Sequence, residues 1–355
     1  MIAALAAPTV ALAEATIYGQ AHVTMDWFDI TGDEDTKYKG WRLNRGGMGK
    51  GNPRGSRMGI KGSEDLGRGL KAIYQIEFNI PLKDAEEFGI TDINRMDLRM
   101  RNSYAGLKGA FGTVLMGRHD TPFKLSTSKL DLFNDTMADH QGTLGFDDLR
   151  IDSTIVYMTP RIQGFQFAAA LIPGAASTLP GIFLEETSLE ADGLAEGYSL
   201  AATYANGPWY FGVVHEFMGE NFEGTLEDDP ADFEKWRVGL GIRDLAGFYM
   251  STLYEEQRAI NALEKQYGKN NDADMWQVQV GYALGNNMIK AMYGQKDHNL
   301  ETTRYYNLTD LTSWAFGFDH KLSPRTKAYA LYTHVDGDLN ESDWKGTSLG
   351  MIHSF

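Results

Sequence analysis

The charged side chains of residues 122–149, PFKLSTSKLDLFNDTMADHQGTLGFDDL, are mostly acidic. Five aspartates stand against two lysines, so this stretch presents carboxylates to whatever it faces. The acids are Asp131, Asp135, Asp139, Asp147 and Asp148. A stretch of this length without strand character is rare in a compact domain unless it has a function or is disordered. Its chemistry is electrostatic, and the elements around it must determine what that chemistry does.

Catalytic and metal-binding patterns find little support in the chain. Residues 346–350, GTSLG, match the G-x-S-x-G pattern of a serine nucleophile, but Ser348 lies in the last expected strand and not at a strand-to-helix turn. The histidines, such as His119 and His140, are not paired at metal-ligand spacing, and the chain has no cysteine. We therefore expect no catalytic residue, no metal and no cofactor.

The bulk composition excludes one class of partner and does not divide the chain. A net charge of −15 argues against nucleic acid, because a phosphate backbone requires a basic surface. A chain of 355 residues has room for two domains, but no shift in composition separates them. We expect a single domain over residues 14–355.

The first thirteen residues, MIAALAAPTVALA, predict a signal peptide. They are uncharged and apolar and end in Ala-Leu-Ala, the small-x-small pattern of a signal-peptidase site. This segment is too short to span a bilayer, and no other apolar run approaches a transmembrane helix. The sequence therefore predicts an exported chain that is cleaved after Ala13 and is not held by membrane helices.

Alternating apolar and polar residues predict strands. Residues 16–27 place apolar side chains such as Ile17 and Trp27 on one face, and residues 235–243 and 275–284 repeat this alternation. A period of two is the signature of a β-strand. A soluble β-sandwich alternates in the same way, so the pattern alone does not choose between a sandwich and a barrel.

The lengths of the connections favour a barrel. Seven short turns alternate with eight long, mostly acidic connections, and these fifteen connections join sixteen strands. The short turns are expected at 64–69, 108–112, 160–165, 205–208, 244–247, 285–287 and 323–326. The long connections are expected near 29–55, 81–98, 120–149, 174–196, 219–232, 257–272, 298–310 and 337–345.

Strict alternation places every short turn at one end, as in outer-membrane barrels with short periplasmic turns and long external loops. In hydrocarbon no backbone group can stay unpaired, so a sheet spans a membrane only by closing on itself. We therefore predict an all-β fold, a 16-stranded antiparallel transmembrane β-barrel.

Several stretches resemble the Gram-negative general-diffusion porins. They are ATIYGQ (15–20), SRMGIKGSEDLGRGLKAIYQIEF (56–78), RNSYAGLKGAFGTVLMGRHDTPF (101–123), DLRIDSTIVYMTPRIQGF (148–165) and GMIHSF (350–355). The resemblance implies an outer-membrane channel for passive diffusion of ions and small hydrophilic solutes. It also implies a homotrimer, contact with outer-membrane lipid and lipopolysaccharide, and folding by the barrel-assembly machinery.

The last strand carries a separate signal. Leu349, Met351, His353 and Phe355 alternate on one face, which resembles the C-terminal signature that the assembly machinery reads. The chain departs from the family in having Ile352 where an arginine is frequent. It also lacks the Pro-Glu-Phe-Gly-Gly element common at the tip of the third loop, which bears on the fine geometry of the pore.

In this family the third long loop folds into the barrel and narrows the channel. The resemblance assigns this position to residues 122–149, with a short helix within residues 126–133. Irregular backbone is tolerated at membrane depth where it lines water. Among the acids of this loop, Asp131 and Asp135 are the foremost candidates for the constriction.

The resemblance places a row of arginines on the wall opposite the loop. These are Arg57, Arg101 and Arg150, with Lys61 and Arg118 as further candidates. The alternation along the strands is consistent with an inward orientation of these arginines if Met58, Ile60, Met100 and Ile151 face lipid. Opposed acids and bases create a transverse field that sets ion preference. The simpler alternative is that the arginines only solvate a polar wall and the aspartates lie in solvent.

The excess of acid in the loop and in the chain predicts a weak preference for cations. Two other functions stay open on the sequence. One is a substrate-specific channel, whose mark would be saturable block of current by one solute. The other is an outer-membrane barrel enzyme that uses Ser348.

Overall fold

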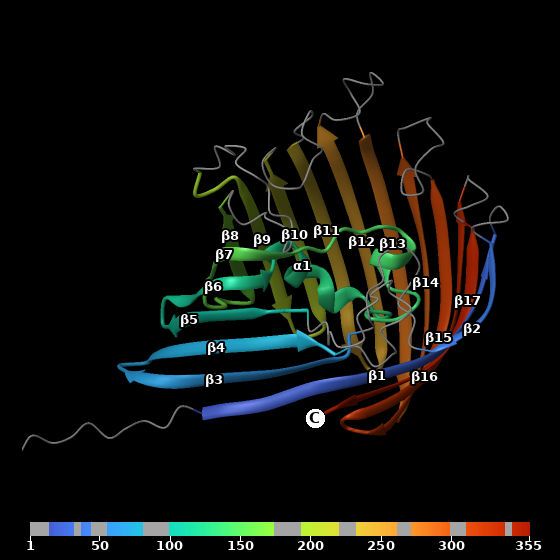
Figure 1. Ribbon diagram of the computed structural model, residues 1–355, viewed down its shortest axis with the longest axis horizontal. Helices are drawn as coiled ribbons and strands as arrows, with labels where there is room; N and C mark the ends of the chain where they lie inside the picture. Colours follow the sequence, from blue (N-terminus) through green and yellow to red (C-terminus); the bar gives the residue numbers. More distant parts are fainter. Residues whose placement is uncertain are drawn as a thin grey trace, which may run out of the picture.

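The computed structural model describes residues 14–31, 37–43, 55–80, 99–173, 193–219, 232–260, 271–298, 310–337 and 343–355 (Figure 1). The expected signal peptide, residues 1–13, lies outside this part of the chain. Strand β1 begins at Glu14, directly after the expected cleavage site. Three short helical segments, α1 (Pro122–Thr127), η2 (Ser128–Leu130) and α2 (His140–Thr143), follow one another between two strands. None of the described helices is long and apolar enough to cross a membrane.

The remaining elements are strands, and each pairs antiparallel with its neighbours in the sheet. They are β1 (Glu14–Ile30), β2 (Tyr38–Leu43), β3 (Arg57–Gly67), β4 (Leu70–Asn79), β5 (Ser103–Gly109), β6 (Gly112–Asp120), β7 (Arg150–Met158), β8 (Phe165–Ile172), β9 (Gly197–Asn206), β10 (Trp209–Met218), β11 (Asp232–Leu245), β12 (Phe248–Ile260), β13 (Asn271–Leu284), β14 (Asn287–His298), β15 (Leu311–Ser323), β16 (Thr326–Gly337) and β17 (Trp344–Ser354).

The sheet closes on itself at β1. One edge of β1 pairs with β17, and the other edge pairs with β3 in its first half and with β2 in its second half. Because β2 and β3 share one position, the seventeen strand segments within the described ranges occupy sixteen positions. This confirms the predicted closed, 16-stranded antiparallel barrel. Strand β2 is an addition, since it lies within the connection that we expected at residues 29–55.

The short turns lie where the sequence predicts them. Each of the seven joins two neighbouring strands of the described sheet, as Arg68 and Gly69 join β3 to β4. In this turn, and in the turn at Ala246 and Gly247, both residues have positive φ. That backbone matches the right-handed twist of the strands on either side.

Side chains alternate between an outer and an inner face of the barrel. Ile17, Ile60 and Leu240 are exposed on the outer face, whereas Lys235 and Arg237 are buried on the inner face. This alternation of apolar outer and polar inner residues is the pattern of a membrane-spanning barrel.

Ile151 contradicts its predicted phase. We expected it to face lipid, but it is only 5% exposed and packs against Ile172 and Met218. The register between β6 and β7 shifts between Gly117 and His119, which breaks the simple alternation there. The alternation along the strand therefore no longer supports placing the neighbouring Arg150 on the basic wall of the pore. That assignment rests on the family resemblance alone.

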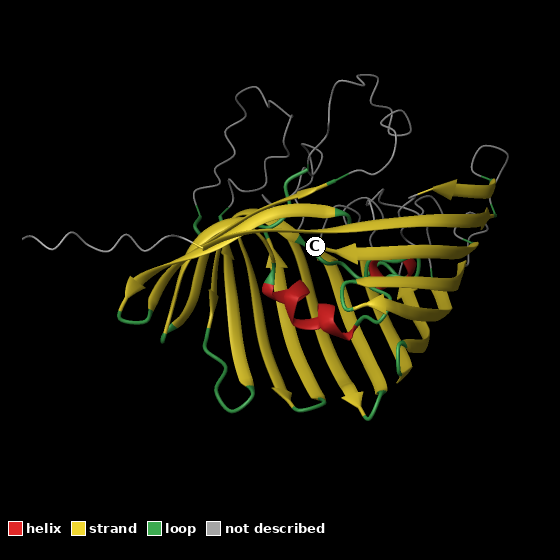
Figure 2. Ribbon diagram, turned by 90° about the horizontal axis from the view of Figure 1, so that it is seen from below, coloured by secondary structure: helices red, strands yellow, loops and turns green. Residues whose placement is uncertain are grey.

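Residues 121–149, called the inner segment from here on, lie against the inner face of the sheet. Helix α1 packs against β8, β9 and β10, and η2 packs against β11 and β12. Figure 2 shows these helical segments inside the curve of the strands. Phe123 and Phe133 are fully buried. The apolar core thus lies between this segment and the strands, and not between two sheets.

Barrel closure depends on room at Gly19. Its backbone exchanges two hydrogen bonds of 3.0 Å with Phe355, and a Cβ there would lie 2.7 Å from the Arg57 carbonyl oxygen. We expect Gly19→Val to lower the free energy of unfolding by about 1–3 kcal/mol through overpacking. Urea unfolding in detergent measures this loss. Ala21→Val, two residues along β1, is the matched control, and an equal loss in both variants would contradict the role of Gly19.

Candidate functional site

Glycines on the inner face of the strands make room for apolar side chains of the inner segment. A Cβ at Gly239 would lie 2.7 Å from Leu130 Cδ1, and a Cβ at Gly294 would lie 2.5 Å from Leu144 Cδ1. Similar contacts pair Gly241 with Leu130, Gly281 with Leu132, Gly317 with Phe133 and Gly346 with Met137. Real Cβ atoms do not approach as closely as at Gly239, Gly241, Gly294 and Gly346, so a larger residue at these four positions would push against the segment.

Wall side chains also satisfy the backbone of the inner segment. Ser251 Oγ donates to the Leu130 carbonyl at 2.6 Å, and Lys290 Nζ donates to the Leu132 carbonyl at 2.7 Å. The Leu132 amide donates to Gln279 Oε1 at 2.6 Å. A buried segment that is neither helix nor strand needs such hydrogen-bond partners, because an unpaired buried amide or carbonyl group costs free energy. These bonds tie the segment to β12, β13 and β14.

Two basic side chains of β11 hold the acids at the end of the segment. Lys235 Nζ lies 2.9 Å from Asp147 Oδ2, and Arg237 Nη1 lies 2.7 Å from Asp148 Oδ1. Arg237 Nε also pairs with Glu255. Both basic side chains are fully buried. Removing one member of a buried ion pair leaves its partner uncompensated, so these pairs hold the segment in one position.

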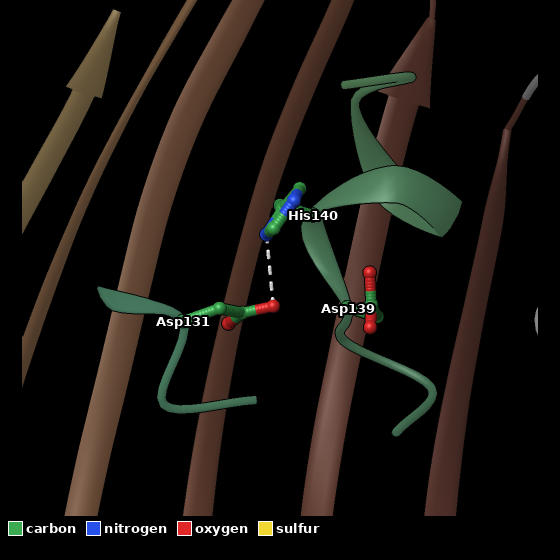
Figure 3. A group of neighbouring side chains, drawn as sticks. All are labelled: Asp131, Asp139 and His140. Atoms are coloured by element: carbon green, nitrogen blue, oxygen red, sulfur yellow. Dashed lines mark hydrogen bonds and ion pairs between the residues drawn. The ribbon is translucent and has the colours of Figure 1, made fainter. Parts of the chain in front are cut away.

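His140 links two acids inside the segment, and Figure 3 shows its contact with the first of them, Asp131. Its Nδ1 lies 2.9 Å from Asp131 Oδ2, and its Nε2 lies 3.2 Å from Asp148 Oδ2. Burial alone would lower the pKa of His140, but the two carboxylates raise it well above its ordinary value. Burial would raise the pKa of Asp131, but His140 holds it below its ordinary value. The imidazole is therefore charged and ion-paired at neutral pH.

Asp131, Asp139 and His140 place their carboxylate and imidazole atoms within 4.8 Å of one another, as a metal site would require. Each of these atoms already has a hydrogen-bond partner. The Asp139 oxygens accept from the Asp135 and Gln141 amides at 2.8 and 2.9 Å, and Asp131 Oδ1 accepts from the amide group of Gln279. A protonated imidazole cannot ligate a metal. This group is an ion-pair network and not an open ligand set.

One acid of the segment reaches the opposite wall. Asp135 Oδ2 lies 3.3 Å from Arg57 Nη1, and both side chains are about a quarter exposed, at 28% and 26%. Arg57 Nη2 also donates to Gln20 Oε1 at 3.3 Å. Arg57 is on β3 and Arg237 is on β11, and seven strands separate β3 from β11 in either direction around the barrel. The inner segment therefore crosses the barrel interior from one wall to the other.

The other three predicted arginines pair with acids of the strands instead, and Lys61 lies over an aromatic ring. Arg101 Nε lies 2.7 Å from Glu77 Oε1, and Arg150 Nη2 lies 2.9 Å from Asp120 Oδ1. Arg118 Nη1 lies 2.8 Å from Asp152 Oδ2, and Lys61 Nζ lies 4.8 Å from the centre of the Tyr18 ring. Of the five predicted basic residues, Arg57 alone has a described ion pair with one of the predicted loop acids.

The C-terminal residues alternate as expected. Leu349, Met351, His353 and Phe355 are all exposed on the outer side of the sheet. Ser348 takes the other phase, where it is fully buried and lies opposite Asp26 in the ladder. Its place in the middle of β17 is not the strand-to-helix turn of a serine nucleophile.

The sequence reasoning missed the residues that hold the inner segment. Lys235, Arg237, Gly239 and Gly241 all occupy the polar phase of one strand, so their shared face was visible in the alternation. What they bind was not visible, because their partners lie about a hundred residues away in the chain; for the Lys235–Asp147 pair the separation is 88 residues. His140 carried no signal beyond its type.

Comparisons with known proteins agree with this architecture. The family model for Gram-negative porins matches residues 1–340. The major outer membrane protein P.IB of Neisseria meningitidis serogroup B is 23% identical over 308 residues, covering 85% of this chain and 83% of that protein. The outer membrane porin protein 32 of Delftia acidovorans is 24% identical over 367 residues, covering 99% of this chain and 94% of that protein.

Solved structures show the same fold. The anion-selective porin from Comamonas acidovorans superposes with a TM-score of 0.75 at 19% identity, over 97% of this chain and 100% of that chain. OmpT of Vibrio cholerae, in a structure described as the trimer form, gives a TM-score of 0.65 at 16% identity, over 97% of this chain and 99% of that chain.

Leu130 is the side chain whose loss should loosen the inner segment most directly. It is 1% exposed and fills the space above two glycines of β11. We expect Leu130→Ala to cost about 2–5 kcal/mol locally, because it leaves a cavity. Limited proteolysis with mass spectrometry should then detect new cuts within residues 121–149. Leu240→Ala, on the outer face of the same strand, is the control and should add no cut; an uncut Leu130→Ala barrel would contradict the proposed anchoring.

Proposed function

Because the chain belongs to the Gram-negative porin family, we propose that it forms a water-filled channel for passive diffusion of ions and small hydrophilic solutes across the outer membrane. The observation that carries this proposal is a closed barrel of sixteen strand positions whose inner face is polar. A barrel of this size leaves an aqueous interior unless something fills it. What passes is then determined by the segment that crosses the interior.

We propose that the inner segment is the inward-folded third loop that narrows this channel. Its support is the pair of attachments at Arg237 on β11 and Arg57 on β3, which lie on opposite walls. Because the segment packs against strands from β8 to β17 and meets β3 through a partly exposed ion pair, we place the open path between the segment and the wall that contains β3. Asp135 and Arg57 then border the path, and Arg101 remains the predicted wall charge beyond them.

We further propose a weak preference for cations. Its support is the net charge of −15 and the partly exposed carboxylate of Asp135. Charged side chains at a constriction set ion preference at short range. The preference is weak because Asp131, Asp147 and Asp148 are paired inside the barrel and because Arg57 and Arg101 oppose it. Lys61, Arg118 and Arg150 stay predicted wall residues.

Single-channel current in a planar bilayer with a KCl gradient tests the constriction. Asp135→Asn should shift the reversal potential toward anions, with the cation-to-anion permeability ratio reduced about twofold, because one charge is lost within several ångströms of the path. Arg57→Gln should shift it in the opposite direction. Asp274→Asn, which removes an acid that accepts from the Tyr254 hydroxyl and pairs with no predicted wall residue, should leave it close to wild type.

The possible results test the channel, the constriction and the cation preference separately. Folded protein that inserts but carries no current would overturn the channel. A channel in which neither Asp135→Asn nor Arg57→Gln alters selectivity would overturn the constriction. An anionic reversal potential in the wild type would overturn the cation preference and leave the other two intact.

We also propose that the chain assembles as a homotrimer. The support is family membership and a fold neighbour described as a trimer. Native mass spectrometry of unheated protein in detergent should give three times the mass of the mature chain. A monomer under these conditions would contradict the trimer.

The remaining partners follow from the outer surface. We propose that the exposed row Leu349, Met351, His353 and Phe355 is read by the barrel-assembly machinery, and that the apolar outer face contacts outer-membrane lipid and lipopolysaccharide. Cleavage after Ala13 would leave a mature chain that starts with β1.

A further inference from the structure

Asp135 does not hold its position by itself. It is a non-glycine residue at φ +60, in the left-handed region that L-residues seldom adopt. Its amide donates a 2.8 Å hydrogen bond to Asp139 Oδ2. The carboxylate of Asp139 therefore fixes the backbone from which the Asp135 side chain reaches Arg57.

The second oxygen of Asp139 anchors the same carboxylate to α2. Asp139 is the N-cap of α2, and its Oδ1 accepts the Gln141 amide at 2.9 Å. An N-cap aspartate satisfies an amide that the helix leaves unpaired. One carboxylate thus bridges the turn that contains Asp135 and the start of α2.

The charges around Asp139 come from its own segment and from two strands. Asp131 and Asp135 are like charges, and His140 is the opposite charge that lies next to it. From the strands, Arg57 on β3 pairs with Asp135, and Lys290 on β14 donates to the backbone of the same segment. Asp139 is therefore a partly exposed acid beside two other acids, close to the proposed path.

We propose that Asp139 is a positioning residue for ion selectivity: it holds Asp135 against Arg57, and the gain of a proton on Asp139 shifts the channel toward anions. This inference rests on the proposed constriction. It deepens that proposal by making selectivity depend on pH through a residue that does not itself pair with the wall.

The titration of Asp139 lies in an accessible range. Burial raises the pKa of its carboxyl to about 6, and the charges of Asp131 and Asp135 add to this rise, whereas His140 and the Gln141 amide oppose it. A raised pKa means that the packed segment favours the protonated form. Binding of this proton therefore stabilises the folded protein relative to the unfolded chain. The stabilisation is fully present below the ordinary pKa of an aspartate and is lost as pH rises through about 6. Because each Asp139 oxygen accepts a backbone amide, a proton on this carboxyl competes with one of the two bonds, so acid removes a charge and weakens the hold on Asp135.

The experiment compares reversal potentials in one KCl gradient at pH 7.5 and pH 5.0. The wild type should shift toward anions on acidification, with a change in permeability ratio of about twofold centred near pH 6, as expected for one charge. Asp139→Asn should shift toward anions already at pH 7.5 and should then stay constant down to pH 5.0. Asp139→Glu, which keeps a titrating acid, should retain the pH response.

Two further variants make the result specific. Asp274→Asn removes a carboxylate that lies outside the inner segment and accepts from the Tyr254 hydroxyl, so it should keep the full pH response of the wild type. Asp135→Asn reports on the constriction itself at pH 7.5.

If Asp135→Asn alters selectivity but the wild type does not respond between pH 7.5 and 5.0, the role of Asp139 is overturned and the constriction stands. The same holds if Asp139→Asn keeps the wild-type pH response. If Asp135→Asn has no effect on selectivity, the constriction fails and this inference fails with it.

Discussion

Closure of the sheet at β1 is the constraint on which the rest of this structure depends. No backbone group can remain unpaired in hydrocarbon, so a spanning sheet must have no free edge. Here the edges meet because β1 pairs with β17 on one side and with β3 and β2 on the other. Once the sheet is closed, one face of every strand must line an interior, and that interior needs polar side chains.

The inner segment packs more closely against one wall of the barrel than against the other. It packs against strands from β8 to β17, where glycines of the strands leave room for its side chains, wall side chains bond its backbone, and Lys235 and Arg237 form buried ion pairs with it. Toward β3 it makes a partly exposed ion pair through Asp135. The segment therefore has a tightly packed side and a partly exposed side, and our proposal places the path for solutes on the exposed side.

Most of the acid in the inner segment serves to hold it in place. Asp147 and Asp148 pair with β11, Asp131 pairs with His140, and Asp139 caps a helix. Buried ion pairs of this kind contribute less to stability than to a single arrangement, because each partner is costly without the other. Counting aspartates in the sequence therefore overstates the number of unpaired carboxylates in this segment.

The sequence by itself determined the strands, their number of positions, the ends at which short and long connections lie, and the face on which Lys235, Arg237 and Gly239 would point. These properties are local, since a period of two and the turn residues are readable within a dozen residues. Only the tertiary structure decided that Asp135 meets Arg57, that Asp131 and Asp148 meet His140, and that β2 adds a strand beside β1. The physical reason is that these pairs depend on how the closed barrel brings distant segments together. The burial of Ile151, beside a register shift between β6 and β7, was likewise not readable from the alternation.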